Sequence, residues 1–527
     1  MSTIKRHQRA ERKRKLAERE RRVLRRLKHR QGDIRDDPML TASNIHYELA
    51  DRAQGLGAGG IGAMHLLARR SGLIEAIDDR LHLLQIHQPY HESDHVLNIA
   101  YNVLCGGTCL EDLELRRHDE AYLDGLGADR VPDPTTAGDF CRRFDEPDIQ
   151  ALMNTVNQVR LKVWREQPSS FFDEAIIEGD GTMIPTTGEC KEGMDYSYKG
   201  VWGYHPLLVS LANTAEPLFV VNRSGNRPSH EGASWYLDRA AQLCKQAGFK
   251  RILLRGDTDF TQTRRLDRWD QAGYRFVFGI DARSNLVETA ETLPKTGWSR
   301  LKRSTRYQVK TEPRSRSPKV KDAIVRARGF ETIRLCSEDV ATFDYRPTFC
   351  KKTYHVVVVR KNLSIEKGEQ MLFDDVRYFF SITNDDEMSA SDVVFSANDR
   401  CDQENLVAQL KVIRALHAPV DTLLSNWAYM VMASLAWTLK AWFALSLPET
   451  GRWAPRRKAE KRRVLRMEFK TFLNAFLRVP CQIVRTGRRI MYRLLAWNPW
   501  QAVFLRAVEA LRAPPHGVDA TRCPMRC

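Results

Sequence analysis

The segment DEAIIEGDGTMI, at residues 173–184, decides the fold, because the chain changes there from helical to strand-forming patterns. Its apolar centre between turn-forming residues is typical of a strand. Two similar runs, GYHPLLVSLAN (203–213) and PLFVVNRSG (217–225), follow after short polar stretches. We therefore expect three consecutive antiparallel strands.

Helices and strands alternate after this meander. A helix that ends at Gly248 precedes the short buried strand RILLRGD (251–257), and a helix that ends at Gly273 precedes the strand YRFVFGID (274–281). Glycine directly after an amphipathic run is a common helix stop. The order β-β-β-α-β-α-β predicts an α/β fold built on a mixed sheet.

A β-rich insertion is predicted at residues 282–375, where β-branched and aromatic runs alternate with charged turns. The strand RYFFSITN (377–384) then leads into ANDRCDQENLVAQLK (397–411), whose pattern is helical. We assign residues 169–281 and 376–420 to one domain that the insertion interrupts.

The region before the first strand, residues 51–168, shows amphipathic helical patterns. Within it, VPDPTTAGDFCRRF (131–144) has a proline and threonines at the start of a short helix, as in a normal N-cap. That helix is either the reading helix of a helix-turn-helix, with Arg142 and Arg143 available to DNA, or an ordinary capped helix.

Positive charge is concentrated in two flanks of the chain. The net charge is +17, with +11 in residues 1–30 and +12 in residues 452–493, so the remainder is acidic. This segregation favours a polyanion such as double-stranded DNA as partner, although ribosome-bound and membrane-surface proteins also carry basic tails. We expect a flexible basic tail at 1–50, a basic helical region at 421–510 and a second tail at 511–527.

The cysteines and the hydropathy pattern indicate a cytoplasmic protein. Eleven cysteines, without C-x2-C zinc spacing and without an apolar secretory signal, are expected to be reduced thiols. The most apolar segment, 427–447, is interrupted by Lys440 and ends at Pro448. A buried helix is therefore favoured over a membrane span, and we expect no membrane partner.

Three carboxylates are candidates for a shared metal site. Asp180 lies on the first strand of the meander, Asp257 directly follows the fourth strand, and Glu404 lies on the helix after the insertion. Converging carboxylates repel one another, and Mg²⁺ relieves this repulsion because it prefers oxygen ligands. Two such ions can activate an attacking oxygen and stabilise a leaving one in phosphoryl transfer.

Arg400, Glu404 and Lys411 share one face of the predicted helix, because their spacing places them within roughly 40° of one another. They form either a solvated face with ion pairs or a metal-binding glutamate between two phosphate-binding cations. Other acids compete with the three candidate ligands: Glu178, Asp259 and Asp402.

The motifs EGDGTM, YSYKGVWGYHPLL, RGDTDF and NDRCDQENLVAQLK occur in an order that resembles the DDE-type insertion-sequence transposases of bacteria, most closely the family numbered thirteen-eighty. The resemblance covers residues 55–500 approximately, including RVPCQIVRTGRRIMYRLL near the C-terminus. It implies a ribonuclease-H-like catalytic domain with a β-rich insertion. A helical N-terminal DNA-binding domain and a helical C-terminal region are expected to flank it.

The resemblance also implies the roles of the candidate residues. Asp180, Asp257 and Glu404 become catalytic ligands of two Mg²⁺ ions, for which Mn²⁺ can substitute. Arg400 and Lys411 match the cations that bracket the third acid in related transposases. The full set expected to bind DNA phosphates is Arg400, Lys411, Lys199, Arg142 and Arg143.

Ala397 and Asp259 depart from the pattern of the related transposases, and two roles are open for Trp298. Related transposases have a tyrosine where Ala397 stands and a small residue where Asp259 stands, so the role of that tyrosine is in doubt here. Trp298, beside several cations in the insertion, either stacks on an unpaired base or is simply packed.

The resemblance therefore predicts a transposase that binds terminal inverted repeats, cleaves the element ends and joins the 3′ ends to target DNA. We expect it to act as a homodimer on DNA, in the cytoplasm at the nucleoid. Two alternatives are a non-enzymatic DNA-binding repressor derived from a transposase and a stand-alone ribonuclease-H-like endonuclease. The intact acids and cations argue against the repressor.

Overall fold

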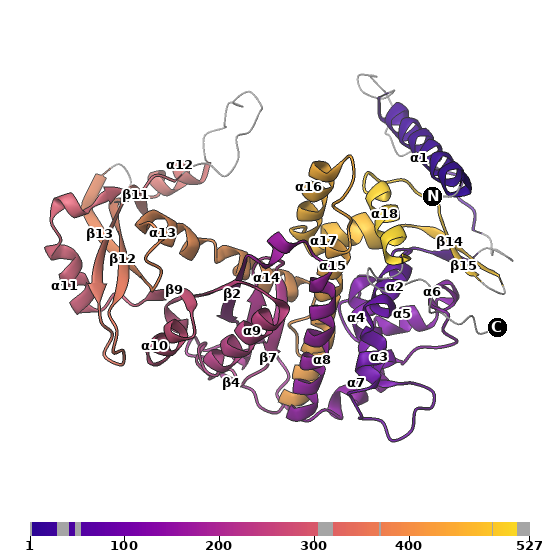
Figure 1. Ribbon diagram of the computed structural model, residues 1–527, viewed down its shortest axis with the longest axis horizontal. Coiled ribbons are helices and arrows are strands. Elements are labelled where there is room, and N and C mark those ends of the chain that lie inside the picture. The colour runs from indigo at the N-terminus through magenta and orange to yellow at the C-terminus, as the bar shows by residue number, and fades with distance from the viewer. Residues whose placement is uncertain are drawn as a thin grey trace.

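The computed structural model describes residues 3–28, 42–47, 54–303, 320–367, 370–486 and 489–513. The molecule is elongated, and three parts follow one another along its long axis (Figure 1). An arm of long strands lies at one end, a sheet with its helices lies in the middle, and a helical part that includes α1 and α18 lies at the other end.

A nine-stranded mixed sheet has the order β10-β11-β12-β13-β9-β8-β2-β6-β7. β2, β8 and β9 are parallel, whereas β6 is antiparallel to both β2 and β7. The predicted meander and the mixed sheet are confirmed. The bounds of these central strands are β2 (Glu174–Gly181), β6 (Leu207–Leu211), β7 (Glu216–Val221), β8 (Arg251–Gly256) and β9 (Tyr274–Ile280).

A small sheet of β3 (Ile184–Pro185), β5 (Trp202–Tyr204) and β4 (Asp195–Tyr196) lies in the chain between β2 and β6. This sheet was not predicted from the sequence. Strands of two or three residues are too short to show an alternating pattern.

Helices cover both faces of the central sheet. α9 (Ala233–Ala247) connects β7 to β8, and α10 (Thr263–Gln271) connects β8 to β9; Gly248 ends α9 in the left-handed conformation with φ of 105°. On β8, Leu254 joins the core on the α9 side, whereas Leu253 packs with residues of α13 (Ala390–Asn398) on the opposite face. This alternation is the period of two expected for a sheet buried on both faces.

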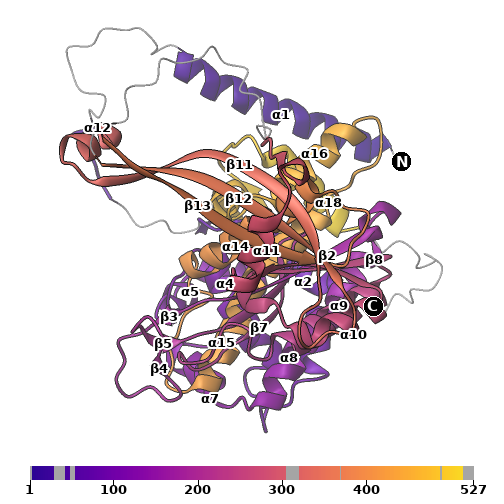
Figure 2. The ribbon, with the colours of Figure 1, turned by 90° about the vertical axis from the view of Figure 1, so that its left-hand side faces the viewer.

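The insertion continues the central sheet and is not a separate unit. β13 pairs antiparallel with β9, with Phe380 opposite Ile280, so the predicted boundary at residue 375 falls inside a strand. Figure 2 shows these long, curved strands rising from the sheet. The bounds are α11 (Ser284–Thr292), β10 (Ser299–Arg300), α12 (Val320–Ala327), β11 (Glu331–Tyr345), β12 (Tyr354–Lys367) and β13 (Gln370–Thr383).

The long apolar helix α15 (Leu423–Leu445) joins the helical part to the sheet. It packs against β7 and against four N-terminal helices. By length and composition it could cross a membrane, but its apolar window is entirely buried within the protein, as predicted. The N-terminal helices are α2 (Ile61–Ser71), α3 (Leu73–Asp78), α4 (Glu92–Leu104), α5 (Leu113–Arg117), α6 (Glu120–Leu126), α7 (Pro134–Arg142) and α8 (Glu146–Arg165).

A buried polar network fixes the contact between α8, β7 and α15. Glu216 of β7 is fully buried and accepts hydrogen bonds from Arg160 at 3.0 Å, Trp164 at 3.0 Å and Trp442 at 2.8 Å. Because a buried carboxylate is stable only when it is paired and hydrogen-bonded, this arrangement specifies how the three elements meet.

The C-terminal region is not entirely helical, which corrects the prediction. β14 (Cys481–Thr486) and β15 (Arg489–Leu494) are paired antiparallel, and β14 also pairs with β1 (Gly55–Leu56). The other elements there are α16 (Ala454–Leu465), α17 (Phe469–Phe472), a π-helical turn (Leu473–Leu477) and α18 (Gln501–Leu511). Apolar and polar residues alternate in this segment at Ile483, Ile490 and Tyr492, but its many arginines made the strand pattern difficult to recognise from the sequence.

The glycine-rich run at residues 55–63 allows these two ends of the chain to pack closely. A side chain at Gly60 would clash with the Phe476 carbonyl oxygen, and one at Gly62 would clash with the Tyr492 ring. The glycines therefore serve backbone packing between the N- and C-terminal segments.

Residues Thr3–Lys28, within the predicted basic tail, form one long helix, α1. Arg9 and Arg12 form ion pairs with Glu509 of α18 at 2.9 and 2.7 Å, and Arg19 donates to the Leu494 carbonyl oxygen at 3.0 Å. These partners lie 475 to 500 residues away in sequence, so local composition could not predict the contact.

Candidate active site

Two neighbouring parallel strands bring the first two acids together. In the pairing of β2 with β8, Glu178 lies opposite Arg255. Asp180 and Asp257 each lie two residues further along, at the carboxyl ends of these strands. Because side chains two residues apart point to the same face, both carboxylates lie on the face that also carries Glu178 and Arg255.

Gly179 and Gly256, which directly precede Asp180 and Asp257, allow Phe260 to pack closely against both strands. A side chain at Gly179 would meet the Phe260 ring at 3.1 Å, and one at Gly256 would meet the Phe260 Cβ atom at 2.6 Å. Phe260 belongs to the motif RGDTDF and is fully buried. The same motif thus supplies an acid and the aromatic residue that packs under both strand ends.

The helix α14 (Cys401–Val412) brings the third acid to this edge. Arg400, which precedes it, connects two of the carboxylates: its guanidinium is 3.3 Å from Asp257 Oδ2 and 3.4 Å from Glu404 Oε1. On the buried side of α14, Gln403 donates to the Leu208 carbonyl oxygen of β6 at 3.4 Å. The helix is therefore anchored on the sheet with Glu404 at its exposed edge.

The electrostatics show that the acids are crowded. Burial, together with the negative charges of Asp257 and Glu404, raises the pKa of Asp180 to about 7, although Arg400 acts in the opposite direction. Burial also raises the pKa of Asp257. Burial lowers the pKa of Lys411, against the attraction of Asp180, so this ammonium group lies close enough to interact with the first acid.

The competing acids have other roles or positions. Glu178 is almost fully buried and pairs with Arg255, which also donates to the Ser396 carbonyl oxygen at 2.9 Å. No role was predicted for Arg255, although a charged residue inside the apolar strand RILLRGD indicates a buried ion pair. The backbone N–H of Asp259 donates to Asp257 Oδ1 at 3.1 Å, so Asp259 helps to orient the second acid.

Over residues 56–516, the sequence matches the family described as transposase DDE domain group 1. The chain belongs to this transposase family. No curated protein matches the sequence. Among solved structures, the cryo-EM structure of a piggyBac transposase synaptic complex with hairpin DNA is similar, with 11% identity, a TM-score of 0.30, and coverage of 80% of this chain and 81% of that chain.

The carboxylates of the transposase fit a hard divalent ion by their chemistry. All three offer oxygen ligands, and burial, with smaller contributions from Asp257 and Glu404, disfavours the charged form of Asp180, which a cation would stabilise. Within the described residues, their oxygens do not all lie within 4.8 Å of one another, and the Arg400 guanidinium lies between Asp257 and Glu404. In this structure Arg400 therefore partly neutralises two of the three carboxylates.

The other predicted DNA-binding residues lie at the end of α7 and in the turn between β4 and β5. Lys199 is exposed beside the Tyr198 ring, in the turn between β4 and β5. Arg142 is held by Asp421 and Asp139, all at 2.8 Å, whereas Arg143 is exposed at the end of α7.

Trp298 lies near the base of the arm, beside β10. The guanidinium carbon of Arg360 is 4.1 Å from the centre of its ring, and the ring is partly buried against the core. In this structure Arg360 occupies a face of the indole that base stacking would use.

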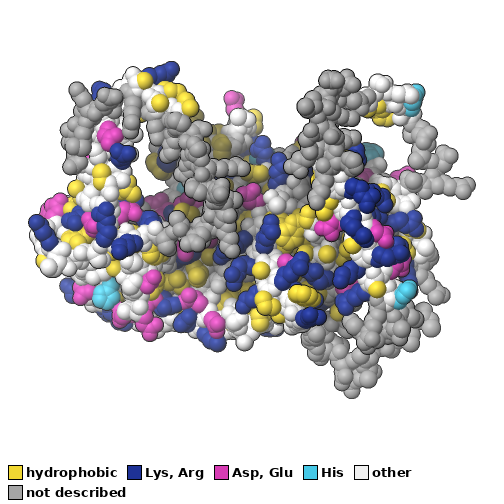
Figure 3. All heavy atoms as spheres, turned by 90° about the horizontal axis from the view of Figure 1, so that it is seen from above, with side chains coloured by type: hydrophobic (Ala, Val, Ile, Leu, Met, Phe, Trp, Pro, Cys, Tyr) yellow, Lys and Arg dark blue, Asp and Glu magenta, His cyan; other side chains and the backbone are white. Residues whose placement is uncertain are grey.

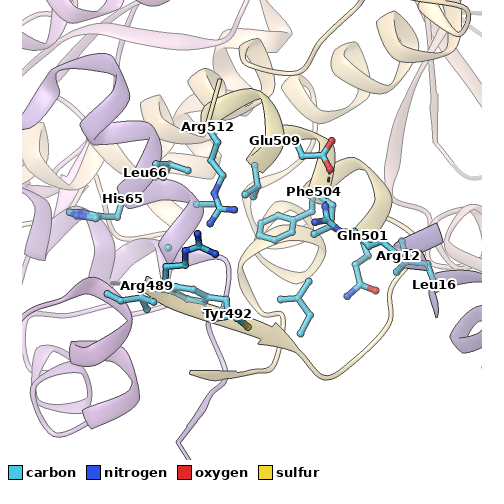
Figure 4. Close-up of a pocket in the computed structure, with 18 of the residues that line it drawn as sticks. Arg12, Leu16, His65, Leu66, Arg489, Tyr492, Gln501, Phe504, Glu509 and Arg512 are labelled. Atoms are coloured by element: carbon cyan, nitrogen blue, oxygen red, sulfur yellow. Dashed lines mark hydrogen bonds and ion pairs between the residues drawn. The ribbon is translucent and has the colours of Figure 1, made fainter. Parts of the chain in front are cut away.

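A cavity of about 790 Å³ lies between α1, α2, β15 and α18, within the helical part (Figure 4). Its wall is apolar at Leu66 and Phe504, and Arg489 and Arg512 project into the same space. Lys and Arg side chains are also numerous on the adjoining upper face (Figure 3). The molecule therefore has an acidic centre in its middle part and a basic surface on its helical part.

Proposed function

We propose that this transposase cleaves DNA at the ends of its element and joins the freed 3′ ends to target DNA, with Asp180, Asp257 and Glu404 as metal ligands. The observation that carries the proposal is the meeting of three acids, distant in sequence, at the carboxyl ends of β2 and β8. We further propose that the strands β2 and β6–β9 with their helices form a ribonuclease-H-like catalytic domain.

Two Mg²⁺ ions, or Mn²⁺ in their place, would supply Lewis acidity for attack on a phosphodiester and for departure of the leaving oxygen. The chain's own residues position the reactants. Arg400 is bound to two acids in the free protein and becomes available to a DNA phosphate when the acids bind metal. Lys411 lies on the same helix face and can contact a second non-bridging oxygen.

In the proposed reaction, water first attacks the phosphodiester at the element end, and the bond to the 3′ oxygen breaks. The freed 3′ hydroxyl then attacks a phosphodiester of the target and displaces its 3′ oxygen. Each step exchanges one phosphate ester bond for another bond to the same phosphorus, so no oxidant or energy donor is needed.

We propose that the basic helical part binds the duplex of the terminal repeats. Its support is the concentration of cations in α1 and α16 and around the cavity next to α18. Phosphate contacts of this kind give affinity that falls steeply with salt. We also propose that the protein works as a homodimer on two element ends, in the cytoplasm at the nucleoid.

The test is cleavage of a DNA fragment that contains the reading frame and its flanks, with wild-type protein and Asp257→Asn. We expect nicks at inverted repeats with Mg²⁺, and joining of the ends to a supercoiled plasmid. Asp257→Asn should bind the same fragment but not cleave it. Binding without cleavage by the wild type would support the repressor, and cleavage without joining would support a stand-alone endonuclease.

A further inference from the structure

A second group of potential metal ligands lies in the helical part, at the start of α4. One ligand atom each from His87, His91 and Glu92 lies within 4.8 Å of the other two, and this is the one such group among the residues that the structure describes. His87 Nε2 is 3.0 Å from Glu92 Oε2. The rings of His87 and His91 are stacked with their centres 4.6 Å apart.

Glu92 is fixed in an orientation suited to a ligand. Its side chain is 1% exposed, and Oε1 accepts hydrogen bonds from the backbone N–H groups of Leu83 and Leu84, both at 3.0 Å. These two bonds leave Oε2 directed at His87. A carboxylate buried to this degree requires compensating partners, and the backbone N–H groups of Leu83 and Leu84 with the His87 ring are the partners here.

We propose that His87, His91 and Glu92 bind one transition-metal ion of the Zn²⁺ class. Two imidazole nitrogens with one carboxylate oxygen are a ligand set that zinc accepts with a water at its open position. Imidazole selects Zn²⁺ and its neighbours over Mg²⁺, so the site is chemically distinct from the all-carboxylate set of the active site. Both histidines are exposed, which gives the ion a path from solvent.

The local charge favours a cation despite the nearby helix end. A helix N-terminus carries partial positive charge, which opposes cation binding. Here Asp78 accepts hydrogen bonds from the backbone N–H and the hydroxyl of Ser93, both at 2.9 Å, and Asp94 accepts one from the His91 N–H at 2.9 Å. Together with Glu92, these groups place three carboxylates around the first turn of α4.

The ion would fasten the segment between α3 and α4 to the first turn of α4. Glu92 already accepts hydrogen bonds from the Leu83 and Leu84 N–H groups of that segment. A metal ion bound to Glu92 would also hold His87 and His91 in place. We therefore expect it to contribute to the stability of the helical part, independently of catalysis.

The experiment uses the full-length protein, stripped with a chelator, reloaded with ZnCl₂ and freed of excess metal. Zinc per chain is then measured by mass spectrometry, and the melting temperature is measured with and without zinc. We expect the wild type to retain about one zinc more per chain than His87→Ala/His91→Ala, and zinc to raise the melting temperature of the wild type alone. His82→Ala, which removes an exposed histidine of the same segment, should match the wild type.

Two further variants make the result decisive. Glu92→Gln keeps an acceptor for Leu83 and Leu84 and should lose zinc even if the double variant folds poorly. Asp257→Asn should retain zinc, because it alters only the active site. Equal zinc content in the wild type, the double variant and Glu92→Gln would overturn the proposal and leave His87 and Glu92 as a hydrogen-bonded pair.

Discussion

Glu404 can be replaced without disturbing the fold, because its side chain is 59% exposed at the edge of α14. Glu404→Gln removes one charge and little volume. We expect Mg²⁺-dependent cleavage to fall at least roughly 100-fold, since one metal loses a ligand and the attacking oxygen loses its position. Binding to the element ends should be unchanged in a mobility-shift assay.

The matched control is Asp402→Asn, on the same helix. Asp402 is exposed and is not held by Arg400 in the way that Glu404 is, so cleavage should remain within a few-fold of the wild type. A similar loss of cleavage in both variants would contradict the specific role of Glu404. Near wild-type cleavage by Glu404→Gln would show that this face of α14 is only a solvated surface with ion pairs.

Lys440 makes stability depend on pH. It is buried in α15, donates to the Leu465 carbonyl oxygen at 3.0 Å and lies 3.9 Å from the Trp437 ring centre. Burial lowers its pKa from 10.5 to about 7. Between these two values the unfolded chain binds a proton that the folded chain does not, so this group's contribution to stability rises with pH across the window and is lowest below pH 7.

We therefore expect Lys440→Met to raise the free energy of unfolding at pH 6.5 by about 2 kcal/mol, because it removes a buried charge. At pH 9 the difference from the wild type should be much smaller. Urea denaturation of both proteins at the two pH values measures this. An equal difference at both values would mean that Lys440 does not titrate in this window.

Much of the arrangement of the candidate site could be predicted from single residues and their spacing. The helical period placed Arg400, Glu404 and Lys411 on one face, and the strand assignments placed Asp180 and Asp257 at neighbouring strand ends. The bridging position of Arg400 and the burial of Glu178 with Arg255 could not be predicted, because both depend on how α13 and α14 pack on the sheet.

At the scale of the element, α1 is held by ion pairs that salt weakens. Exposed pairs such as those of Arg9 and Arg12 with Glu509 contribute about 0–1 kcal/mol each. Deleting residues 1–28 should flatten the dependence of DNA affinity on salt, by about 0.9 in the log–log slope for each phosphate that α1 neutralises in the wild type. A fluorescence-anisotropy titration with duplex DNA measures the slope.

Glu509→Gln is the matched variant for this prediction. It keeps α1 but frees Arg9 and Arg12, so DNA affinity at low salt should rise and the slope should steepen. If the deletion and the wild type give the same slope, α1 does not contact DNA.

The two arginines of α7 should behave differently. Arg142→Ala removes the ion pairs with Asp139 and Asp421 and should lower stability by at most about 1 kcal/mol, with little effect on DNA preference. Arg143→Ala leaves those pairs intact. If α7 reads the terminal repeat, the Arg143→Ala substitution should reduce the preference for that repeat over random duplex by about 1–3 kcal/mol, measured at one salt concentration. An unchanged preference would remove α7 from the interface.

Elements formed by local sequence were predicted better than elements that depend on distant partners. The meander and α9 have clear periods and stop signals. The pairing of β13 with β9 and of β14 with β1 joins segments about 100 and 430 residues apart, which no local pattern encodes. The docking of α1 depends in the same way on Glu509.

At the scale of the whole molecule, α15 is the element that the other parts share. It contacts β7, α16 and the N-terminal helices α2, α4, α7 and α8, and almost all of its side chains are buried. The proposed DNA-binding part and the proposed catalytic part therefore have a common core, and we expect them to unfold together in a single thermal transition.

The position of α15 also determines when the protein can fold during synthesis. The N-terminal helices leave the ribosome first, but their core partner ends at Leu445. Arg400 leaves 143 residues after Asp257, a delay of roughly 7 to 29 s at typical rates of translation. A chain that extends past Asp257 but ends before Glu404 thus has two of the proposed ligands but neither the third ligand nor the shared core. Under the proposed function, we expect such a chain to be unable to cleave DNA.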